Sequence, residues 1–490
     1  MLDFIRIHPS DNVLVALRNI PAGTVFENVM VQRSVPAGHK VASAYIACGE
    51  QIIKYGSPIG HAKADIPAGE WVHTDNVLTN LLEENTYVYE PNLQYPEPVE
   101  AESFLGYRRS GGKVGIRNEI WIIPTVGCVN GVAEALERNC QDLVSGSIDG
   151  LYAFPHPFGC SQTGADHAQT RRLLAALTRH PNAGAVLVLG LGCENLTRSE
   201  FEEELGVYNS QRVKFLVCQE TSDEFAAGRA LLEECAAYAS QFHREKCSCR
   251  DLVIGLKCGG SDGLSGITAN PVVGRFSDML VARGGSTVLT EVPEMFGAEQ
   301  FLINRCVDDV VFKKAVAMIR GFKEYFIRHG ETVYENPSPG NKAGGITTLE
   351  DKSCGCVQKG GFAPIVDVID YGHIVTKKGL TMLCGPGNDL VSSTALAAAG
   401  AHLLLFTTGR GTPFGAPVPT LKISTNTPLA KHKSRWIDFN AGVVADGGCG
   451  LEQAAEDLFS LVLRTAAGQP TLSEEGGFRD IAIFKDGVTL

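Results

Sequence analysis

Val-Leu-Val-Leu-Gly-Leu-Gly-Cys, residues 186–193, is an apolar run of strand-forming residues that ends at a glycine followed directly by a cysteine. Two earlier segments, 120–128 and 152–160, end in the same Gly-Cys pair. From about residue 105 such runs alternate with helical patterns, which is typical of parallel sheets covered by helices. The chain is therefore predicted to be an α/β protein. The three cysteines are expected beyond the carboxyl ends of parallel strands, where ligands bind.

The composition, with 44% hydrophobic and 20% charged residues among 490, is that of a globular protein with room for several domains. A formal net charge of −12 argues against a nucleic-acid or anionic-membrane partner, because either would need a basic face. The N-terminus has no signal-peptide pattern and the chain has no apolar run of membrane-spanning length, so we expect a cytoplasmic protein. Its 15 cysteines are then expected to be reduced thiols.

The chain divides by composition into four parts. Residues 1–82 combine short strand-like runs with three Pro-Ala-Gly turns and are predicted to form a compact β module. Residues 83–104 are acidic and proline-rich, as in an extended linker. A break near 244–250 separates a predicted middle α/β domain, 105–246, from a C-terminal α/β domain, 247–490.

Four glycine-rich polar loops stand out in the C-terminal half, at 258–266, 336–345, 385–389 and 408–413. Glycines allow backbone N–H groups to turn toward an anion, and none of the loops matches a dinucleotide or ATP fingerprint. We expect a shared site for a polyol or carboxylate, in which an arginine can grip a carboxylate with two hydrogen bonds. The candidate substrate-binding residues are Arg117, Asn118, Gly259, Gly260, Ser261, Asp262, Asn388, Asp389, Arg410 and Thr412.

Long motifs follow one another in a fixed order, including those at 115–119, 124–130, 258–271, 290–300 and 386–389. On these motifs the chain resembles the altronate dehydratase / galactarate dehydratase family of sugar-acid hydro-lyases over nearly its whole length. Its last residues, 484–490, favour the altronate branch. The resemblance implies an N-terminal β-clip (SAF-like) module and a C-terminal Rossmann-like domain with a parallel sheet. It also implies dependence on iron(II) or another divalent metal, such as Mn²⁺, under reducing conditions.

Two positions depart from the pattern that the resemblance leads us to expect. Asp75 stands where a second histidine of the β module is expected, and Gly164-Ala165 precede Asp166-His167 where two acids are expected before the histidine. Either departure would move a metal or proton role to another residue.

The reaction implied by the resemblance is dehydration of D-altronate to 2-keto-3-deoxy-D-gluconate. The alternatives are a galactarate dehydratase and a non-catalytic sugar-acid-binding protein. Removing the weakly acidic proton beside the carboxylate requires a metal or several aimed donors to stabilise the enediolate. We expect a homodimer with a small-molecule sugar-acid substrate.

Acid–base and metal residues can be proposed on this basis. His156, His167 and Lys342 are the candidates for proton transfer, against the alternative of structural histidines and a surface lysine. Two hypotheses for the metal stay open. One is a thiolate site of Cys128, Cys160 and Cys193, including an iron–sulfur cluster with one open iron, and the other is a mononuclear iron(II) on Glu291 and Glu294.

Overall fold

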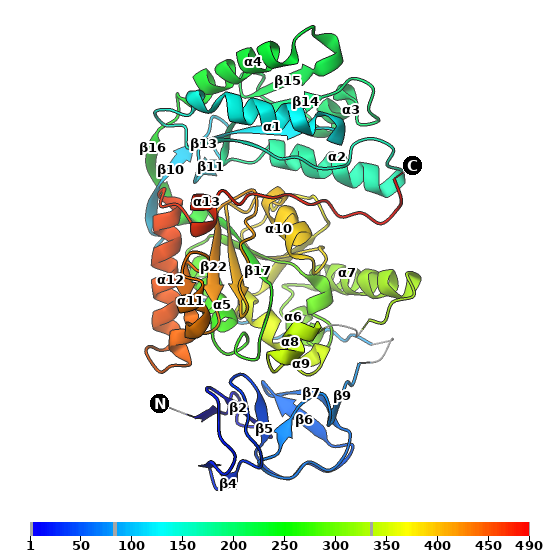
Figure 1. Ribbon diagram of the computed structural model, residues 1–490, viewed down its shortest axis with the longest axis vertical. Coiled ribbons are helices and arrows are strands. Elements are labelled where there is room, and N and C mark those ends of the chain that lie inside the picture. Colours follow the sequence, from blue (N-terminus) through cyan, green and yellow to red (C-terminus); the bar gives the residue numbers. More distant parts are fainter. Residues whose placement is uncertain (1–2, 82–85, 334–336, 490) are drawn as a thin grey trace.

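The computed structural model describes residues 3–81, 86–333 and 337–489, so linker residues 83–85 and Asn336 of the second glycine-rich loop lie outside the described residues. Figure 1 shows three parts stacked along the long axis: the N-terminal β module at one end, the C-terminal domain in the centre and the middle domain at the other end. Within the described ranges, no helix has the length and apolar character needed to cross a membrane.

The N-terminal module is built entirely from short antiparallel strands. One sheet has the order β1-β2-β5-β8, a second has the order β6-β7-β9, and β3 pairs with β4. Their bounds are β1 Phe4–Ile5, β2 Val13–Ala16, β3 Val25–Phe26, β4 Val29–Met30, β5 Lys40–Ala42, β6 Gln51–Lys54, β7 Ser57–Ala62, β8 Trp71–Val72 and β9 Val77–Leu78. Tight turns join them, and the glycine of each Pro-Ala-Gly turn adopts a positive φ near 80°, which glycine tolerates without strain.

The described part of the linker runs along the C-terminal domain. The Tyr89 hydroxyl donates to the carbonyl of Cys306, and the backbone N–H of Val99 donates to that of Ala282. The chain then enters a small antiparallel sheet of order β11-β10-β16, formed by β10 Ser103–Arg108, β11 Val114–Gly115 and β16 Arg244–Ser248. Because β16 follows the middle domain in sequence, this sheet ties the entry of that domain to its exit.

The middle domain has a parallel sheet of order β13-β12-β14-β15 with helices on both faces. Alternate residues of β12 point to opposite faces: Ile120 and Ile122 join one buried cluster, and Trp121 and Ile123 join another. Burial on both faces explains why its strands are continuous apolar runs. The elements are β12 Glu119–Pro124, α1 Asn130–Asn139, β13 Gly150–Ala153, α2 Gly164–Thr178, β14 Ala183–Gly190, α3 Arg198–Leu205, β15 Val213–Val217 and α4 Glu224–Ala239.

The C-terminal domain has a seven-stranded, all-parallel sheet of order β19-β20-β18-β17-β21-β22-β23. Its strands are β17 Val253–Cys258, β18 Ser286–Leu289, β19 Ile365–Ile369, β20 Gly379–Leu383, β21 Leu403–Thr408, β22 Thr420–Ser424 and β23 Phe439–Asn440. Its helices are α5 Ala269–Ala282, α6 Glu299–Ile303, α7 Asp309–Arg328, α8 Pro339–Ala343, α9 Leu349–Cys356, α10 Asp389–Ala398, α11 Thr427–His432, α12 Leu451–Ala466 and α13 Leu472–Glu475.

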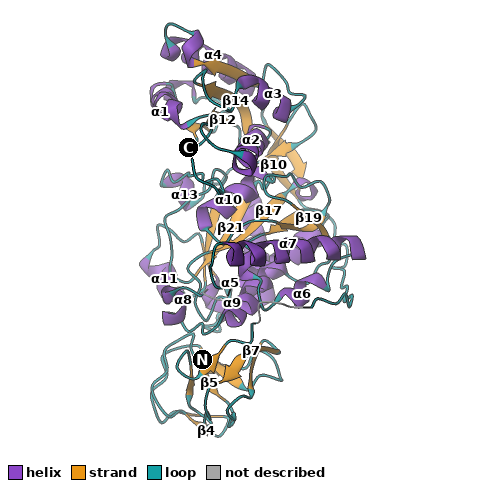
Figure 2. Ribbon diagram, turned by 90° about the vertical axis from the view of Figure 1, so that its right-hand side faces the viewer, coloured by secondary structure: helices purple, strands orange, loops and turns teal. Residues whose placement is uncertain are grey.

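The predicted fold class, a mixed α/β chain with a β module first and a parallel sheet in the C-terminal part, is confirmed. One apolar cluster contains Trp121 and Leu174 of the middle domain together with Leu396 and Phe406 of the C-terminal domain, so these two domains share a core. On the opposite side of the C-terminal domain, α8 and α9 lie between the sheet and the N-terminal module, as Figure 2 shows from a second direction.

Candidate functional site

The C-terminal sheet reverses its strand order between β17 and β21, because the chain runs outward from β17 to β18 and later returns to the other side of β17 at β21. At such a switch point the loops beyond the carboxyl ends of the strands diverge and leave room for a ligand. The loops that follow β17, β18, β20 and β21 all begin at this edge. The candidate site is therefore built at the ends of buried strands, because β18, β20 and β21 are buried along their whole length and β17 is buried from Ile254 onward.

Three buried side chains converge at this edge. The sulfur of Cys258, at the end of β17, lies 3.1 Å from a Glu294 carboxylate oxygen and 3.5 Å from the sulfur of Cys356, at the end of α9. The Cys356 sulfur lies 3.4 Å from the same carboxylate oxygen. Among the described residues, this is the one group of three Cys, His, Asp or Glu side chains that brings a ligand atom of each within 4.8 Å of the others.

Three lysine ammonium groups surround the trio. Lys359 contacts the Cys258 sulfur at 2.7 Å and a Glu291 oxygen at 2.8 Å. Lys352 forms an ion pair with Glu294 at 2.7 Å. Lys257, in β17, bridges Glu291 and Asp389, with an Nζ to Oδ1 distance of 2.9 Å to Asp389.

The charges in this cluster govern its protonation. Burial would raise the pKa of the Glu294 carboxyl, but Lys352 and then Lys257 and Lys359 oppose it and hold that pKa at about 2. Burial would likewise lower the pKa of the Lys257 ammonium, but Glu291 and Asp389 outweigh burial and raise it. The hydrogen bond with Cys356, together with burial, raises the pKa of the Cys258 thiol well above its usual range. The cluster therefore holds an ionised carboxylate, charged lysines and a thiol that is protonated in the absence of a metal.

This donor set fits a divalent metal. Three lysine side chains face the three carboxyl side chains of Glu291, Glu294 and Asp389, so the basic and acidic groups around the trio are equal in number. A cysteine binds a metal as the thiolate, so a divalent cation would replace the proton of the Cys258 thiol. Two sulfurs and one carboxylate oxygen suit iron(II) or a metal of similar softness, whereas Mg²⁺ or Ca²⁺ would require oxygen ligands.

Glu291 holds two of the lysines in place. Its oxygens accept hydrogen bonds from Lys257, Lys359 and the backbone N–H of Cys258. Strand β18 ends at Leu289, and two residues later Glu291 takes a left-handed backbone conformation with φ of 69°. Such a conformation is costly for a non-glycine residue, and strained residues of this kind cluster at active sites.

Helix α9 brings Lys352 and the thiol of Cys356 to the site. The helix is capped by the residue before it, Thr348, whose hydroxyl accepts a hydrogen bond from the backbone N–H of Asp351. A Cβ atom at Gly355 would lie 3.3 Å from the Cα of Gly266 and from the hydroxyl oxygen of Tyr55. A glycine at this position therefore lets the helix pack closely enough for Cys356 to reach Cys258.

Most of the predicted substrate loops lie against this cluster. A Cβ atom at Gly259 would lie 2.6 Å from an Asp389 carboxylate oxygen, and a Cβ atom at Gly387 would lie 3.7 Å from Glu294. Ser261 accepts a hydrogen bond at 2.8 Å from Asn341 of α8, the short helix that carries the exposed Lys342. These contacts place the loops after β17 and β20 and helix α8 around one site.

The remaining predicted loop residues at this edge have mixed surroundings. Asp262 is held by Thr425 at 2.8 Å and by Asn426 at 3.1 Å, and burial raises the pKa of its carboxyl. The side chains of Asn388 and Thr412 accept hydrogen bonds from nearby backbone N–H groups and so order their own loops. Gly260 has a positive φ, and Arg410 is exposed close to α8.

The three Gly-Cys loops lie at the carboxyl edge of the other parallel sheet. Cys128 and Cys193 are exposed and Cys160 is half-buried. Cys160 lies 3.5 Å from the side-chain oxygen of Asn195, and Cys193 lies 3.5 Å from the side-chain nitrogen of Gln219. The three sulfurs do not form a group with all ligand atoms within 4.8 Å of one another. Their role as metal ligands stays a prediction.

The two predicted histidines also belong to the middle domain. The ring nitrogens of His156 meet the carbonyl oxygen of Pro124 at 2.8 Å and the backbone N–H of Phe158 at 3.2 Å. Burial lowers the pKa of His156 to about 4, so the ring is neutral near pH 7. His167 is half-buried on α2. Neither belongs to the cluster around Cys258.

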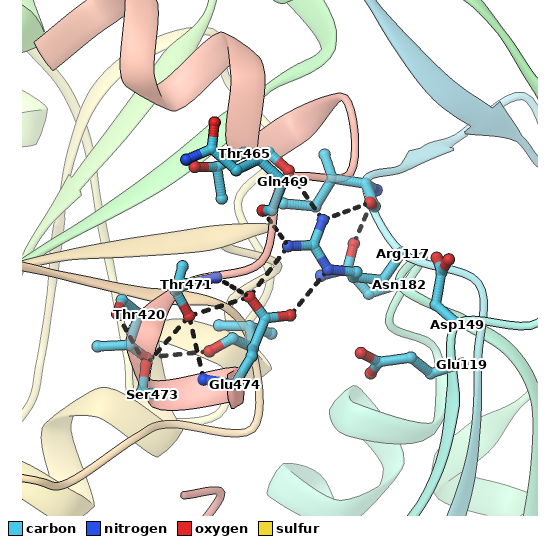
Figure 3. A network of polar contacts seen from close by, with 12 residues as sticks. Arg117, Glu119, Asp149, Asn182, Thr420, Thr465, Gln469, Thr471, Ser473 and Glu474 are labelled. Atoms are coloured by element: carbon cyan, nitrogen blue, oxygen red, sulfur yellow. Dashed lines mark hydrogen bonds and ion pairs between the residues drawn. The ribbon is translucent and has the colours of Figure 1, made fainter. Parts of the chain in front are cut away.

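Arg117 lies in a polar network between the middle and C-terminal domains (Figure 3). Arg117 forms a two-pronged ion pair with Glu474 at 2.8 and 3.0 Å and donates to the carbonyl oxygens of Thr465 and Gln469. The side chain of Asn118 bonds to Arg109 and to backbone carbonyls. Arg117 therefore holds the two domains together, whereas the partners of Asn118 all belong to the middle domain, and the substrate-binding role of both residues stays a prediction.

Lys257 and Lys359 were not identified from the sequence. Lys257 interrupts the otherwise apolar run of β17 directly before Cys258, which is an unusual place for a charge. That anomaly was the available signal. Cys356 is the second cysteine of the C-x-C pair 354/356, Lys359 follows three residues later, and nothing local to that segment distinguishes either residue.

Comparison with known proteins agrees with this architecture. The family described as altronate/galactarate dehydratase SAF domain matches residues 2–80, the family described as D-galactarate dehydratase/altronate hydrolase, second domain, matches 106–240, and the family described as D-galactarate/altronate dehydratase, C-terminal, matches 249–489. The predicted SAF module is thereby confirmed. The three matched domains follow one another along the chain, and all three are described as domains of altronate or galactarate dehydratases.

Full-length relatives give the same result. The chain is 52% identical to altronate dehydratase of Bacillus subtilis (strain 168) and 50% identical to altronate dehydratase of Escherichia coli (strain K12), in both cases over the whole of both chains. It is 34% identical to galactarate dehydratase (L-threo-forming) of Escherichia coli (strain K12), over 98% of this chain and 96% of that protein. The chain therefore belongs to the altronate/galactarate dehydratase family.

Proposed function

We propose that this protein is a hydro-lyase that converts D-altronate to 2-keto-3-deoxy-D-gluconate and water. The observation that carries the proposal is the identity of about half of all positions, end to end, with two altronate dehydratases. Galactarate is the alternative substrate, and the lower identity of 34% with a galactarate dehydratase makes it the second choice. The charged, buried cluster at the switch point of the C-terminal sheet supports a catalytic protein over a non-catalytic binding protein.

We propose iron(II) as the metal and Cys258, Glu294 and Cys356 as the residues that would hold it. This donor set differs from both sequence hypotheses and retains only Glu294 from them. A bound divalent metal would act as a Lewis acid and stabilise the negative charge that develops beside the substrate carboxylate. Mn²⁺ and an iron–sulfur cluster stay alternatives, which metal analysis of anaerobically purified protein would distinguish.

Asp389 and Lys257 are proposed as the proton-transfer pair. The side chain of Asp389 is 36% exposed, whereas that of Lys257 is fully buried, so Asp389 forms the accessible side of the pair. The Asp389 carboxylate would take the proton from C2, and the Lys257 ammonium would give a proton to the C3 hydroxyl, which leaves as water. The resulting enol becomes the keto acid by gaining a proton at C3 and losing its hydroxyl proton. A proton passing from Asp389 to Lys257 across 2.9 Å restores both groups.

The substrate carboxylate and hydroxyls are proposed to bind to the glycine-rich loops and to Arg410. Lys342 is exposed on α8 beside these loops. Its predicted acid–base role therefore remains a proposal, with carboxylate binding as the alternative. The expected homodimer is likewise a proposal, to be measured by analytical ultracentrifugation.

The test is turnover by purified protein reconstituted with iron(II) under anaerobic conditions. Keto-acid formation is measured with D-altronate, galactarate and their stereoisomers as separate substrates. We expect the highest kcat/KM with D-altronate. Turnover of galactarate alone would reassign the substrate, and no keto acid from any sugar acid would refute the hydro-lyase assignment.

A further inference from the structure

The N-terminal module contacts the C-terminal domain next to the candidate metal site. In Figures 1 and 2 the module lies next to α8 and α9. The turn at Gly38 packs so closely on the loop after β17 that Gly263 has no room for a Cβ atom. The module is therefore fitted against the same loops that form the site.

A buried charge cluster forms the centre of this contact. The Lys40 ammonium, from β5, donates to one carboxylate oxygen of Asp351 at 2.8 Å, and the Lys54 ammonium, from β6, donates to the other at 2.9 Å. All three side chains are essentially inaccessible to solvent. Lys40 also donates to the carbonyl oxygen of Gly345 at 2.9 Å. The module therefore grips Asp351 from two different sheets.

Asp351 lies in α9, the helix that supplies the site. The next residue, Lys352, forms the ion pair with Glu294, and the last residue of the helix, Cys356, contacts Cys258. Glu350 accepts hydrogen bonds from Thr79 at 2.8 Å and from the backbone N–H of Asn80 at 2.6 Å, both on the module side. One eight-residue helix thus has the module on one side and the metal site on the other.

We propose that Lys40 and Lys54 are positioning residues of the active site, which act through Asp351 to hold α9 where Cys356 and Lys352 can complete the metal site. The inference rests on the proposed function for the identity of the site, but it concerns the geometry of the helix. The N-terminal module then serves to hold α9, and with it two groups of the catalytic centre, in a fixed position.

The physical basis is the cost of a buried carboxylate oxygen that loses its partner. When one lysine is removed, the Asp351 oxygen that it contacted has no solvent to replace the ammonium group, so the helix that carries Asp351 moves or rotates. Residues that orient metal ligands indirectly typically change metal affinity by about ten- to a hundredfold when they are mutated. A shift of α9 would act on the second thiol and on the lysine at the same time.

The experiment compares Lys54→Met with Arg479→Met. Arg479 forms an equally buried ion pair with Glu119, at 2.8 Å, between the C-terminal tail and the middle domain, so its loss tests a merely structural effect. Full-length proteins are titrated anaerobically with Co²⁺, and the sulfur-to-cobalt absorption band reports thiolate coordination without turnover. The melting temperature, kcat and KM are measured on the same preparations.

We expect Lys54→Met to weaken Co²⁺ binding by at least about tenfold and to lower kcat more than it raises KM. Arg479→Met is expected to lower the melting temperature by a similar amount while Co²⁺ affinity stays within about twofold of wild type. Equal Co²⁺ affinity and kcat in Lys54→Met and wild type, below the melting temperature, would overturn the inference. Equal weakening of Co²⁺ binding in both variants would also overturn it, because any loss of stability would then suffice.

Lys40→Met provides a milder variant if Lys54→Met does not fold. The Asp351 oxygen that Lys40 contacts also accepts hydrogen bonds from the backbone N–H and the hydroxyl of Thr347, so it keeps partners in this variant, and a loss of Co²⁺ affinity of about threefold to tenfold is expected. An unchanged affinity in Lys40→Met would contradict the positioning role. Because the cobalt titration needs no substrate, failure of the protein to dehydrate altronate would refute the proposed function and leave this inference standing.

Discussion

The middle and C-terminal domains are both parallel sheets with cysteines beyond their strand ends, yet their carboxyl edges differ in chemistry. In the middle domain, Cys128 and Cys193 are exposed and Cys160 is half-buried. In the C-terminal domain, Cys258 and Cys356 are buried within 3.5 Å of each other, beside Glu294. The two edges share a topology and differ in what covers them.

The cover explains the difference. Helices α8 and α9 lie over the C-terminal edge, and the N-terminal module packs on their other side (Figures 1 and 2). Exclusion of water strengthens electrostatic interactions, which is how three lysines and three carboxylates come to be held at fixed distances. A strand end is therefore a potential site, and the segment that closes over it makes the site reactive.

The largest effect is expected when a proposed metal-binding side chain is removed from the covered edge of the C-terminal sheet. Cys356→Ser should abolish stable iron binding and lower kcat by about a thousandfold, because several kcal/mol of charge stabilisation are lost. Cys354→Ala is the matched control, since Cys354 is a buried thiol in the same helix, outside the group of three. Metal content and turnover are measured together. Retention of iron and full rate in Cys356→Ser would show that the covered edge is not the metal site.

The next effect concerns the lysine that links the cluster to Asp389. Lys257→Met should lower kcat by about a hundredfold, the usual scale for a positioned proton donor. Asp389→Asn should lose exchange of the substrate C2 proton with solvent as well as dehydration, whereas Lys257→Met should retain exchange.

Lys422→Met is the control for removing a buried lysine from the same sheet, because Lys422 lies in β22 outside the ion pairs of the cluster. Its turnover should stay within about twofold of wild type. Loss of C2 exchange in Lys257→Met would contradict the assignment and make Lys257 the base.

The sequence was sufficient to predict most of the parallel strands and where their polar loops emerge, although β22, Thr420–Ser424, was not predicted. The apolar runs that lead to Gly190 and Cys258 are strands, and both lie in parallel sheets, because an uninterrupted apolar run can be buried on both faces. The glycine-rich loops 258–266 and 385–389 indeed lie at one edge. Local pattern determines these features.

The sequence could not indicate which sheet edge is closed. Cys258 and Cys356 are 98 positions apart, and Lys359 reaches Cys258 over 101 positions, so their meeting depends on the path of α9. The interpretation gave weight to three similar Gly-Cys ends, although similarity in sequence carries no information about burial. Lys257 was overlooked because a lysine is normally assigned to the surface.

A smaller effect is expected from His156, at the edge of the middle sheet. Burial lowers its folded-state pKa to about 4, below the usual value near 6.5, so the unfolded chain binds a proton more readily over that interval. Its contribution to stability is present above pH 6.5 and is lost as the pH falls toward 4, by about 2 kcal/mol between pH 7 and pH 5.

Thermal melting at pH 7 and pH 5 tests this. His156→Asn should show a smaller drop in melting temperature between the two pH values than wild type, with turnover at pH 7 close to that of wild type. A hundredfold loss of turnover with unchanged melting would instead support the proton-transfer role predicted from the sequence.

The smallest effect is expected at the uncovered edge. The triple variant Cys128→Ser, Cys160→Ser, Cys193→Ser should keep its iron content and turn over substrate within about twofold of wild type, because replacing sulfur by oxygen at exposed and half-buried positions changes little. Wild type and the triple variant are purified anaerobically side by side, and iron per chain and absorption spectra are compared. Loss of iron in the triple variant, with iron retained in Cys356→Ser, would reverse the comparison. The metal would then belong to the middle sheet, and the covered cluster would be left with its lysines and carboxylates as acid–base groups alone.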